Sequence, residues 1–211
     1  MTGDACEHVG QLIFSDLGID SSILNTQQPS CTRIAFEAPI LPTRQKNSHK
    51  GSFGQALVVG GDFGYGGAAI MAAESALLCG AGLVSLATRE QHVLASLARR
   101  PELMVRGVQT ALDIKPMLEN CNALVAGPEI GQSDWSHEVL SACLDTQIPL
   151  LVDADELNLL ASGFSKYRNH RDWILTPHPG EAVRMLGVST SEVQCDRFSA
   201  ARALQEAYGA L

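Results

Sequence analysis

The sequence predicts an α/β fold in which a mostly parallel sheet is covered by helices on both faces. From residue 55 onward, short apolar runs alternate with longer stretches of helical composition, the pattern of a parallel sheet. The run at 56–59 is continuous and bounded by glycines, as expected for a strand buried on both faces. The expected strands cover residues 56–59, 83–87, 103–108, 123–126, 149–152 and 173–175. The expected helices cover residues 67–78, 91–99, 112–118, 135–144, 181–186 and 191–208.

Length and composition fit one domain with a hydrophobic core, since 45% of the 211 residues are hydrophobic. The net charge of −8 argues against broad binding to nucleic acids or anionic membranes. No apolar run approaches the roughly 20 residues that a membrane-spanning helix needs. Residues 1–8 lack the basic start of a signal peptide. We therefore expect a cytoplasmic protein with a small-molecule partner, without a nucleic-acid or membrane partner, and we leave a homo-oligomer open.

The cysteines indicate neither a zinc site nor a disulfide framework. No two of them stand at C-x-x-C spacing, and a cytosolic chain seldom keeps disulfides. We expect no metal held by protein ligands alone, and we expect most of the cysteines to be small buried apolar residues. The six are Cys6, Cys31, Cys79, Cys121, Cys143 and Cys195.

The chain changes character near Lys50, and this change divides it into three segments. Residues 1–22 contain one apolar cluster, which alone cannot bury enough surface to form a domain. Residues 23–48 are rich in Ser, Thr, Asn, Gln and Pro and are expected to form a linker. Residues 49–211 carry the strand–helix alternation and are expected to form the main domain. Lys50, at the entrance of this domain, either reaches a phosphate or is a solvated surface lysine.

A glycine-rich loop at 60–68 follows the first expected strand, where open α/β sheets bind their ligands. Glycines before a helix let backbone N–H groups approach an anion, although a flexible connector remains an alternative. Residues 64–69 also fit the G-x-G-x-x-A fingerprint of dinucleotide-binding folds, with Glu90 as the acid 21 residues further on. The fit is poor in spacing, because four residues separate the strand from the first fingerprint glycine.

Two further loops follow expected strands and carry polar groups. The loop at 127–131 places glycines around a proline and is either a plain turn or a binding loop. Asp153 and Asp155 are two residues apart, so both carboxylates can face one cleft, with Asn158 shortly after. They would orient a ligand hydroxyl or a hydrated Mg²⁺ ion. The alternative is that Asp155 caps the helix that begins near Glu156.

His178 stands between two prolines directly after the strand expected at 173–175. The prolines fix the backbone on either side and leave the imidazole little conformational freedom to lose on binding. We expect His178 to contact a ligand rather than to fill the core. Glu181 is then favourably placed in the first turn of the following helix.

Taken in order, the motifs of this chain resemble those of one family over residues 49–211. They are Ser48-His49-Lys50-Gly51, the glycine loop ending in Gly67-Ala68, Cys79-Gly80-Ala81-Gly82-Leu83-Val84, Arg100-Pro101-Glu102-Leu103-Met104, Gly127-Pro128-Glu129-Ile130-Gly131, Asp153-Ala154-Asp155-Glu156-Leu157-Asn158 and Thr176-Pro177-His178-Pro179-Gly180-Glu181. This ordered set resembles the NAD(P)H-hydrate dehydratase domain, a member of the ribokinase-like superfamily. Residues 1–22 resemble the final strand and tail of the NAD(P)H-hydrate epimerase domain that precedes it in bifunctional chains.

The resemblance implies a ribokinase-like fold and a repair reaction on nicotinamide nucleotides. ADP or ATP, with Mg²⁺, phosphorylates the ring hydroxyl of NAD(P)H hydrate, and elimination of phosphate then regenerates NAD(P)H. By motif position, Ala68, Gly131 and His178 would contact the hydrate, with Asp153 and Asn158 nearby in support. The resemblance does not tell ADP from ATP, or NADH hydrate from NADPH hydrate.

The sequence departs from the family pattern in two places. Glu129 stands where the family usually has glycine, and a desolvated carboxylate there would repel a phosphate-bearing ligand. The family's nucleotide loop and catalytic aspartate are expected after Leu211, so we assign no catalytic residue within residues 1–211. We accordingly expect an incomplete sheet, poor stability and no dehydratase activity for this polypeptide alone. Two other functions stay open: a vitamin kinase of the same superfamily and a non-catalytic NAD(P)-binding protein.

Overall fold

The computed structural model describes residues 7–11, 13, 15–26, 31, 41, 43–162 and 172–210 of the chain. Its centre is a six-stranded sheet with the strand order β3-β2-β1-β4-β5-β6, in which every neighbouring pair is parallel. The strands are β1 (Gln55–Val59), β2 (Leu83–Thr88), β3 (Met104–Gly107), β4 (Ala123–Ala126), β5 (Leu150–Val152) and β6 (Trp173–Leu175). The α/β class and all six expected strands are confirmed.

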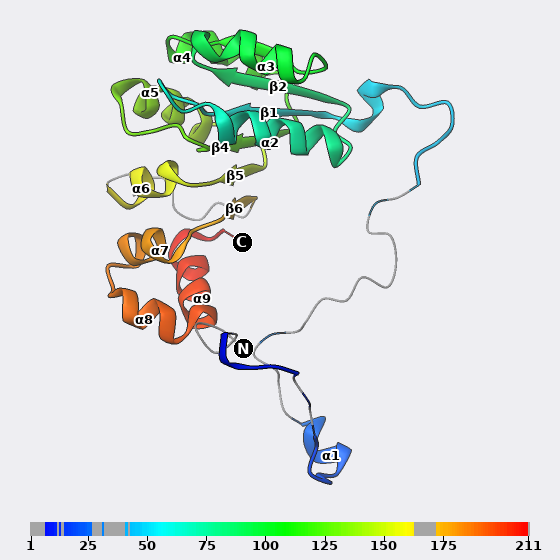
Figure 1. Ribbon diagram of the computed structural model, residues 1–211, viewed down its shortest axis with the longest axis vertical. Helices are drawn as coiled ribbons and strands as arrows, with labels where there is room; N and C mark the ends of the chain where they lie inside the picture. Colours follow the sequence, from blue (N-terminus) through cyan, green and yellow to red (C-terminus); the bar gives the residue numbers. More distant parts are fainter. Residues whose placement is uncertain are drawn as a thin grey trace.

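Helices connect successive strands and gather beyond β6 (Figure 1). The helices that connect the strands are α2 (Gly67–Leu78), α3 (Val93–Arg99), α4 (Ala111–Leu118), α5 (Asp134–Leu144) and α6 (Asp155–Ser162). Beyond β6 come α7 (Pro179–Leu186), α8 (Thr190–Cys195) and α9 (Arg197–Tyr208). The remaining elements are α1 (Ser21–Leu24) and the 3-10 turns η2 (Lys50–Phe53) and η3 (Glu90–His92).

The single helix expected at 191–208 is wrong, because the structure divides it into α8 and α9 at Asp196. Asp196 has non-helical backbone angles, φ −145° and ψ 87°, so it belongs to neither helix. Its carboxylate accepts the backbone N–H of Ser199 and thereby caps α9. The helical periodicity of the sequence continues across Asp196, so it does not reveal the break. The break depends instead on one local capping contact.

Helices cover both faces of the sheet, as the sequence predicts. On one face, Val58, Val84 and Leu86 are fully buried with the alanines of α2. On the other face, Leu57 and Val59 belong to a larger core that includes side chains of α4, α5, α6, α7 and α9. Neighbouring residues of β1 therefore point into different cores, the alternation of a strand buried on both sides.

The α2 face becomes progressively exposed toward β6. Val58, Val125, Leu151 and Ile174 are cross-strand neighbours on this face. Val58 is fully buried, the next two are half-buried, and Ile174 is 48% exposed. Helix α2 therefore covers the β1 and β2 end of this face and leaves the β6 end open among the described residues.

The turn η2 explains the Ser-His-Lys-Gly motif as a packing element. A Cβ atom on Gly82 would lie against the carbonyl oxygen of Lys50, so the start of β2 touches this turn directly. The Lys50 side chain is exposed, in keeping with the solvated alternative.

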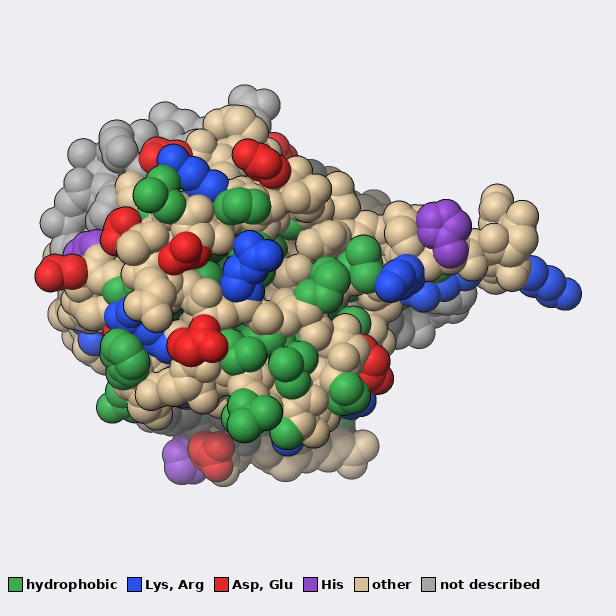
Figure 2. All heavy atoms as spheres, turned by 90° about the horizontal axis from the view of Figure 1, so that it is seen from above, with side chains coloured by type: hydrophobic (Ala, Val, Ile, Leu, Met, Phe, Trp, Pro, Cys, Tyr) green, Lys and Arg blue, Asp and Glu red, His purple; other side chains and the backbone are tan. Residues whose placement is uncertain are grey.

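Figure 2 shows the molecule from above, where acidic, basic and hydrophobic side chains are interspersed.

Three expectations for the rest of the chain have mixed outcomes. Described residues 7–11 contain no strand, and residues 1–6 lie outside the described residues, so the epimerase-like tail stays a prediction; the linker also falls partly outside the described residues. Of the five described cysteines, only Cys121 and Cys143 are buried, so the expectation that most are buried is wrong. The others lie at exposed positions, as Cys79 does at the end of α2. Within the described ranges, no helix is long and apolar enough to cross a membrane.

Glu156 is an unusual member of the core, because it is fully buried and neither carboxylate oxygen has a hydrogen-bond partner. Burial, together with the charge of Asp153, raises the pKa of Glu156 well above its usual value of 4.5. A buried, unpaired carboxyl group is most stable in its neutral form. Above pH 4.5 the folded state therefore retains a proton that the unfolded chain releases.

We predict that Glu156 makes the fold less stable as the pH rises from 4.5 toward its raised folded pKa. One proton changes the free energy of unfolding by at most about 1.4 kcal/mol per pH unit. Glu156→Gln removes the titrating group and should remove this part of the pH dependence. Urea unfolding at several pH values measures both proteins, and identical pH profiles would contradict the prediction.

Candidate functional site

The glycine loop after β1 is fixed by backbone hydrogen bonds to two neighbouring strand ends. The N–H of Gly60 donates to Ala87 O at 3.1 Å, and the N–H of Gly61 donates to Pro128 O at 3.0 Å. A Cβ atom on Gly60 would lie 2.2 Å from Pro128 O, so only glycine permits this approach. The loop is therefore part of the framework at the carboxyl edge of the sheet, and the flexible-connector alternative is wrong.

Ala68, an expected substrate contact, is the second residue of α2, and its N–H is already engaged. It donates to Oε2 of Glu129 at 2.8 Å. Helix α2 has no side-chain cap from its own N-cap residue, so Glu129 supplies the negative charge that a helix N-terminus favours. Glu129 adopts a left-handed backbone with φ +54°, a conformation in which glycine is unstrained. This residue was expected to repel an anion, and its capping contact with α2 was not foreseen.

Gly131, the second expected contact, is held by the loop that follows β5. Its N–H donates to Oδ2 of Asp155 at 3.1 Å. Helix α6 begins at Asp155 itself, so this residue lies in the first turn and is not a cap preceding Glu156. The Asp155 carboxylate thus joins the loops after β4 and β5 at the same edge of the sheet.

Asp153 links the β5 loop to the β6 loop. Its Oδ1 accepts the hydroxyl of Thr176 at 2.6 Å. The loop after β4 approaches it closely as well, since a Cβ atom on Gly127 would lie 1.8 Å from Asp153 O. Gly127 also has φ +121°, which favours glycine. The two aspartates therefore tie together three consecutive strand ends.

His178, the third expected contact, caps α7 with its own side chain. Its Nδ1 accepts the N–H of Gly180 at 2.9 Å, so the ring proton must sit on Nε2. Nε2 lies 3.0 Å from Oε1 of Glu181, whose Oε2 accepts the N–H of His178 at 2.8 Å. The imidazole is nevertheless 60% exposed, and it is not a core residue. Sequence reasoning recognised the rigid frame but missed its origin in helix capping.

One cavity of about 540 Å³ lies beside His178, a size within the range of small-molecule sites. Asn158 also borders it, and Oδ1 of Asn158 accepts a hydrogen bond from Arg184. Asp155 connects this cavity to Gly131, and Glu129 connects the same loop to Ala68. The lining residues are Gln132, Asp155, Asn158, Leu159, His178, Glu181 and Arg184.

Asp62 is the main site residue that sequence reasoning missed. Its carboxylate accepts Nε–H of Arg89 and the hydroxyl of Ser133, both at 2.8 Å, and so bridges the loops after β1, β2 and β4. Arg89 in turn lies over the rings of Phe63 and Trp135, at 4.4 and 4.1 Å from their centroids. Arg89 directly follows β2 and Asp62 is the third residue after β1, so the strand-end rule points to the loops that contain them.

The hydrogen bonds at Asp62 outweigh the cost of burying it. Burial alone would raise the pKa of Asp62, but the hydrogen bonds from Arg89 and Ser133 hold it below the usual value of 3.8. The charged form is therefore favoured in the folded protein. Its contribution to stability is present above pH 3.8 and is lost as the pH falls through the lowered value.

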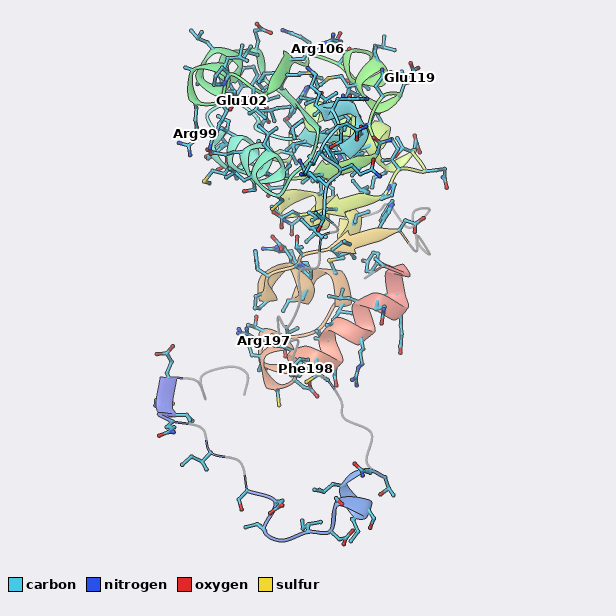
Figure 3. The ribbon with its side chains drawn as sticks, turned by 90° about the vertical axis from the view of Figure 1, so that its right-hand side faces the viewer. Arg99, Glu102, Arg106, Glu119, Arg197 and Phe198 are labelled. Carbon is cyan, nitrogen blue, oxygen red and sulfur yellow. The ribbon has the colours of Figure 1, made fainter. Side chains whose placement is uncertain are left out.

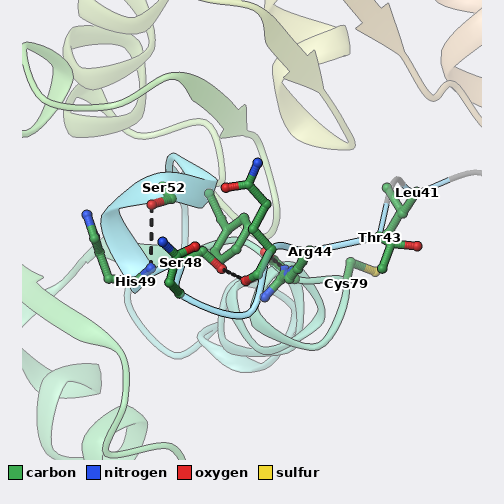
Figure 4. A pocket seen from close by; sticks show the side chains of 11 residues that line it. Leu41, Thr43, Arg44, Ser48, His49, Ser52 and Cys79 are labelled. Atoms are coloured by element: carbon green, nitrogen blue, oxygen red, sulfur yellow. Dashed lines mark hydrogen bonds between the residues drawn. The ribbon is translucent and has the colours of Figure 1, made fainter.

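A second cavity, of about 620 Å³, lies at the opposite end of the strands (Figure 4). It is bordered by the segment before β1 and by Cys79 and Gly80, which precede β2. Arg44 stacks on the ring of Phe53 there at 3.9 Å. None of the expected substrate contacts borders this cavity, so the carboxyl edge remains the candidate site.

The dinucleotide fingerprint and a protein-held metal receive little support from the geometry. A Cβ atom on Gly107 would lie 1.8 Å from the Glu90 carboxylate, which places that acid against the end of β3. Across the described ranges, no group of three His, Cys, Asp or Glu side chains is placed to hold a metal. Asp153 and Asp155 each accept a protein donor instead.

We predict that Asp62→Ala destabilises the fold by about 2–3 kcal/mol, because it leaves the half-buried Arg89 and the Ser133 hydroxyl without their acceptor. Asp62→Asn, which keeps an acceptor oxygen, should cost less. The free energy of unfolding in urea at pH 7 measures both changes. An Asp62→Ala protein as stable as the parent would show that the three loops are held together by other contacts.

Comparisons with known proteins show to which family the chain belongs. The family model described as NAD(P)H-hydrate dehydratase matches residues 56–211. A bifunctional NAD(P)H-hydrate repair enzyme of Coxiella burnetii is 47% identical over 98% of this chain and 42% of its own length. Its counterpart from Escherichia coli is 40% identical over 99% of this chain and 40% of its own length. The chain thus spans about two-fifths of the length of these relatives.

Solved structures show the same fold. A ribokinase-like superfamily protein from Enterococcus faecalis superposes with a TM-score of 0.71 at 25% identity, covering 80% of this chain and 59% of that one. An ADP/ATP-dependent NAD(P)H-hydrate dehydratase from Bacillus subtilis, co-crystallised with ATP and Mg²⁺, gives a TM-score of 0.65 at 26% identity, covering 81% and 60%. The fold is ribokinase-like, and the chain belongs to the NAD(P)H-hydrate dehydratase family.

Proposed function

We propose that this chain carries the substrate side of an ADP- or ATP-dependent NAD(P)H-hydrate dehydratase and acts in the cytoplasm. The observation that carries the proposal is the joining of the strand-end loops. Glu129 links the loop of Ala68 to that of Gly131, and Asp155 links Gly131 to the cavity beside His178. The names of the relatives and of the Bacillus subtilis dehydratase support the same reaction class.

The residues present suit the orientation of a hydroxyl-bearing ring. Backbone N–H groups of Ala68 and Gly131 are donors, and Glu129 and Asp155 next to them are acceptors. A ligand hydroxyl both donates and accepts, so it can pair with such a couple where a methylene group cannot. Nε2–H of His178 is a further donor on the cavity wall, where it also lies 3.0 Å from Oε1 of Glu181. Together these groups would hold the hydroxyl of the hydrate ready for phosphorylation.

Transfer of the phosphoryl group needs further groups that we do not assign within the described residues. When bound with the nucleotide, Mg²⁺ would supply positive charge that offsets the charge of the phosphates during transfer. No set of ligands for it is formed by the described side chains. We propose that the polypeptide of residues 1–211 binds the hydrate without turning it over.

The test is a calorimetric titration of the chain with NADH hydrate and with NADH. We expect the hydrate to bind about tenfold more tightly, since one hydroxyl paired with its site is worth about 1–1.5 kcal/mol. NADH binding as tight as hydrate binding would instead indicate a non-catalytic cofactor-binding protein. Binding of neither would overturn the proposal and reopen the vitamin-kinase alternative.

His178→Ala supplies a matched variant for this titration. It should weaken hydrate binding while leaving the weaker binding of NADH unchanged. Because His178 also caps α7, the helical circular dichroism of the variant must be recorded alongside. Reduced hydrate binding at unchanged helicity would assign the imidazole to the ligand.

A further inference from the structure

We propose that Arg184 binds the diphosphate group of the dinucleotide substrate; this proposal rests on the function proposed above. Arg184 lies in α7, six residues after His178, and borders the same cavity. Arg184 is exposed, so its guanidinium is accessible to a ligand. Neither composition nor motif spacing pointed to this residue.

Charge in the cavity supports the assignment. Two carboxylates border it, but both are engaged: Asp155 accepts the N–H of Gly131, and the buried Glu181 pairs with the backbone and ring of His178. Among the described residues, Arg184 has no acidic group at ion-pair distance. A dinucleotide brings at least two negative charges to a chain whose net charge is −8. The cavity needs a cation for such a ligand, and Arg184 supplies it.

The position of the guanidinium is fixed by Asn158. Nη1 of Arg184 donates to Oδ1 of Asn158, which comes from the neighbouring helix α6. An arginine has five N–H donors, so this contact leaves most of its fork available. A guanidinium held in place in this way can pair with two phosphate oxygens at once. Asn158 is therefore a positioning residue rather than a direct substrate contact.

A substitution can distinguish phosphate binding by Arg184 from a purely structural role in α7. A basic residue in the last turn of a helix stabilises the helix dipole, and Arg184 stands in the last turn of α7. A lysine would serve the dipole equally well, but it cannot make the bidentate contact. Replacement by lysine therefore tests phosphate binding without removing the charge.

The experiment titrates NADH hydrate into the 211-residue chain and its variants by calorimetry. Arg184→Gln should weaken binding about 10- to 100-fold, and Arg184→Lys should weaken it less. The dependence of Kd on salt concentration should become shallower in Arg184→Gln, a change that a structural role would not produce. Asn158→Ala should weaken hydrate binding in the parent chain. When it is combined with Arg184→Gln, it should have no further effect.

Arg106→Gln is the control, because Arg106 is an exposed arginine on β3, at the edge of the sheet opposite to β6 (Figure 3). It should bind the hydrate as the parent does. Hydrate binding that is unchanged in Arg184→Gln, in affinity and in salt dependence, would overturn the inference while leaving the proposed function intact. Failure of the parent chain to bind the hydrate would instead overturn the proposed function itself.

Discussion

The site depends on carboxylates that bridge one strand-end loop to the next. Glu129 holds the N–H of Ala68, Asp155 holds the N–H of Gly131, and Asp62 joins the loops after β1, β2 and β4. Parallel strands end at a common edge, so their loops meet there, and backbone hydrogen bonds such as that from Gly61 to Pro128 fix part of their relative position. The bridging carboxylates add side-chain links between the loops, and they place negative charge within the site for which we propose an anionic ligand.

This arrangement bears on how an acidic chain would bind the dinucleotide that we propose as its substrate. The bridging carboxylates are each paired with N–H or hydroxyl donors, so their charge is partly offset before a ligand arrives. The hydroxyl of a hydrated ring can share these acceptor and donor pairs, while the phosphates are better placed near Arg184. The proposed site would therefore hold the neutral and the anionic parts of its ligand at different places along the edge of the sheet.

Much of the fold could be predicted because buried parallel strands appear as continuous apolar runs, such as those of β1 and β4, whereas the edge strand β3 contains the exposed Arg106 and is indicated mainly by its place in the strand–helix alternation. The break at Asp196 could not, since it depends on one side-chain contact inside a continuous helical pattern. In the site, the resemblance indicated Ala68, Gly131 and His178, but not what holds them. Their partners lie on other loops or, for His178, on its own helix, and such pairings depend on three-dimensional contacts rather than on sequence spacing.

The central claim is that the loops of Ala68, Gly131 and His178 form one binding site. Amide resonances of Ala68, Gly131 and Gly180, followed by ¹⁵N–¹H correlation spectra during titration with NADH hydrate, test it most directly. Gly180 reports on His178, because its N–H donates to the imidazole. We predict that all three resonances shift together with one Kd. Shifts with different midpoints, or a response confined to one loop, would contradict a single shared site.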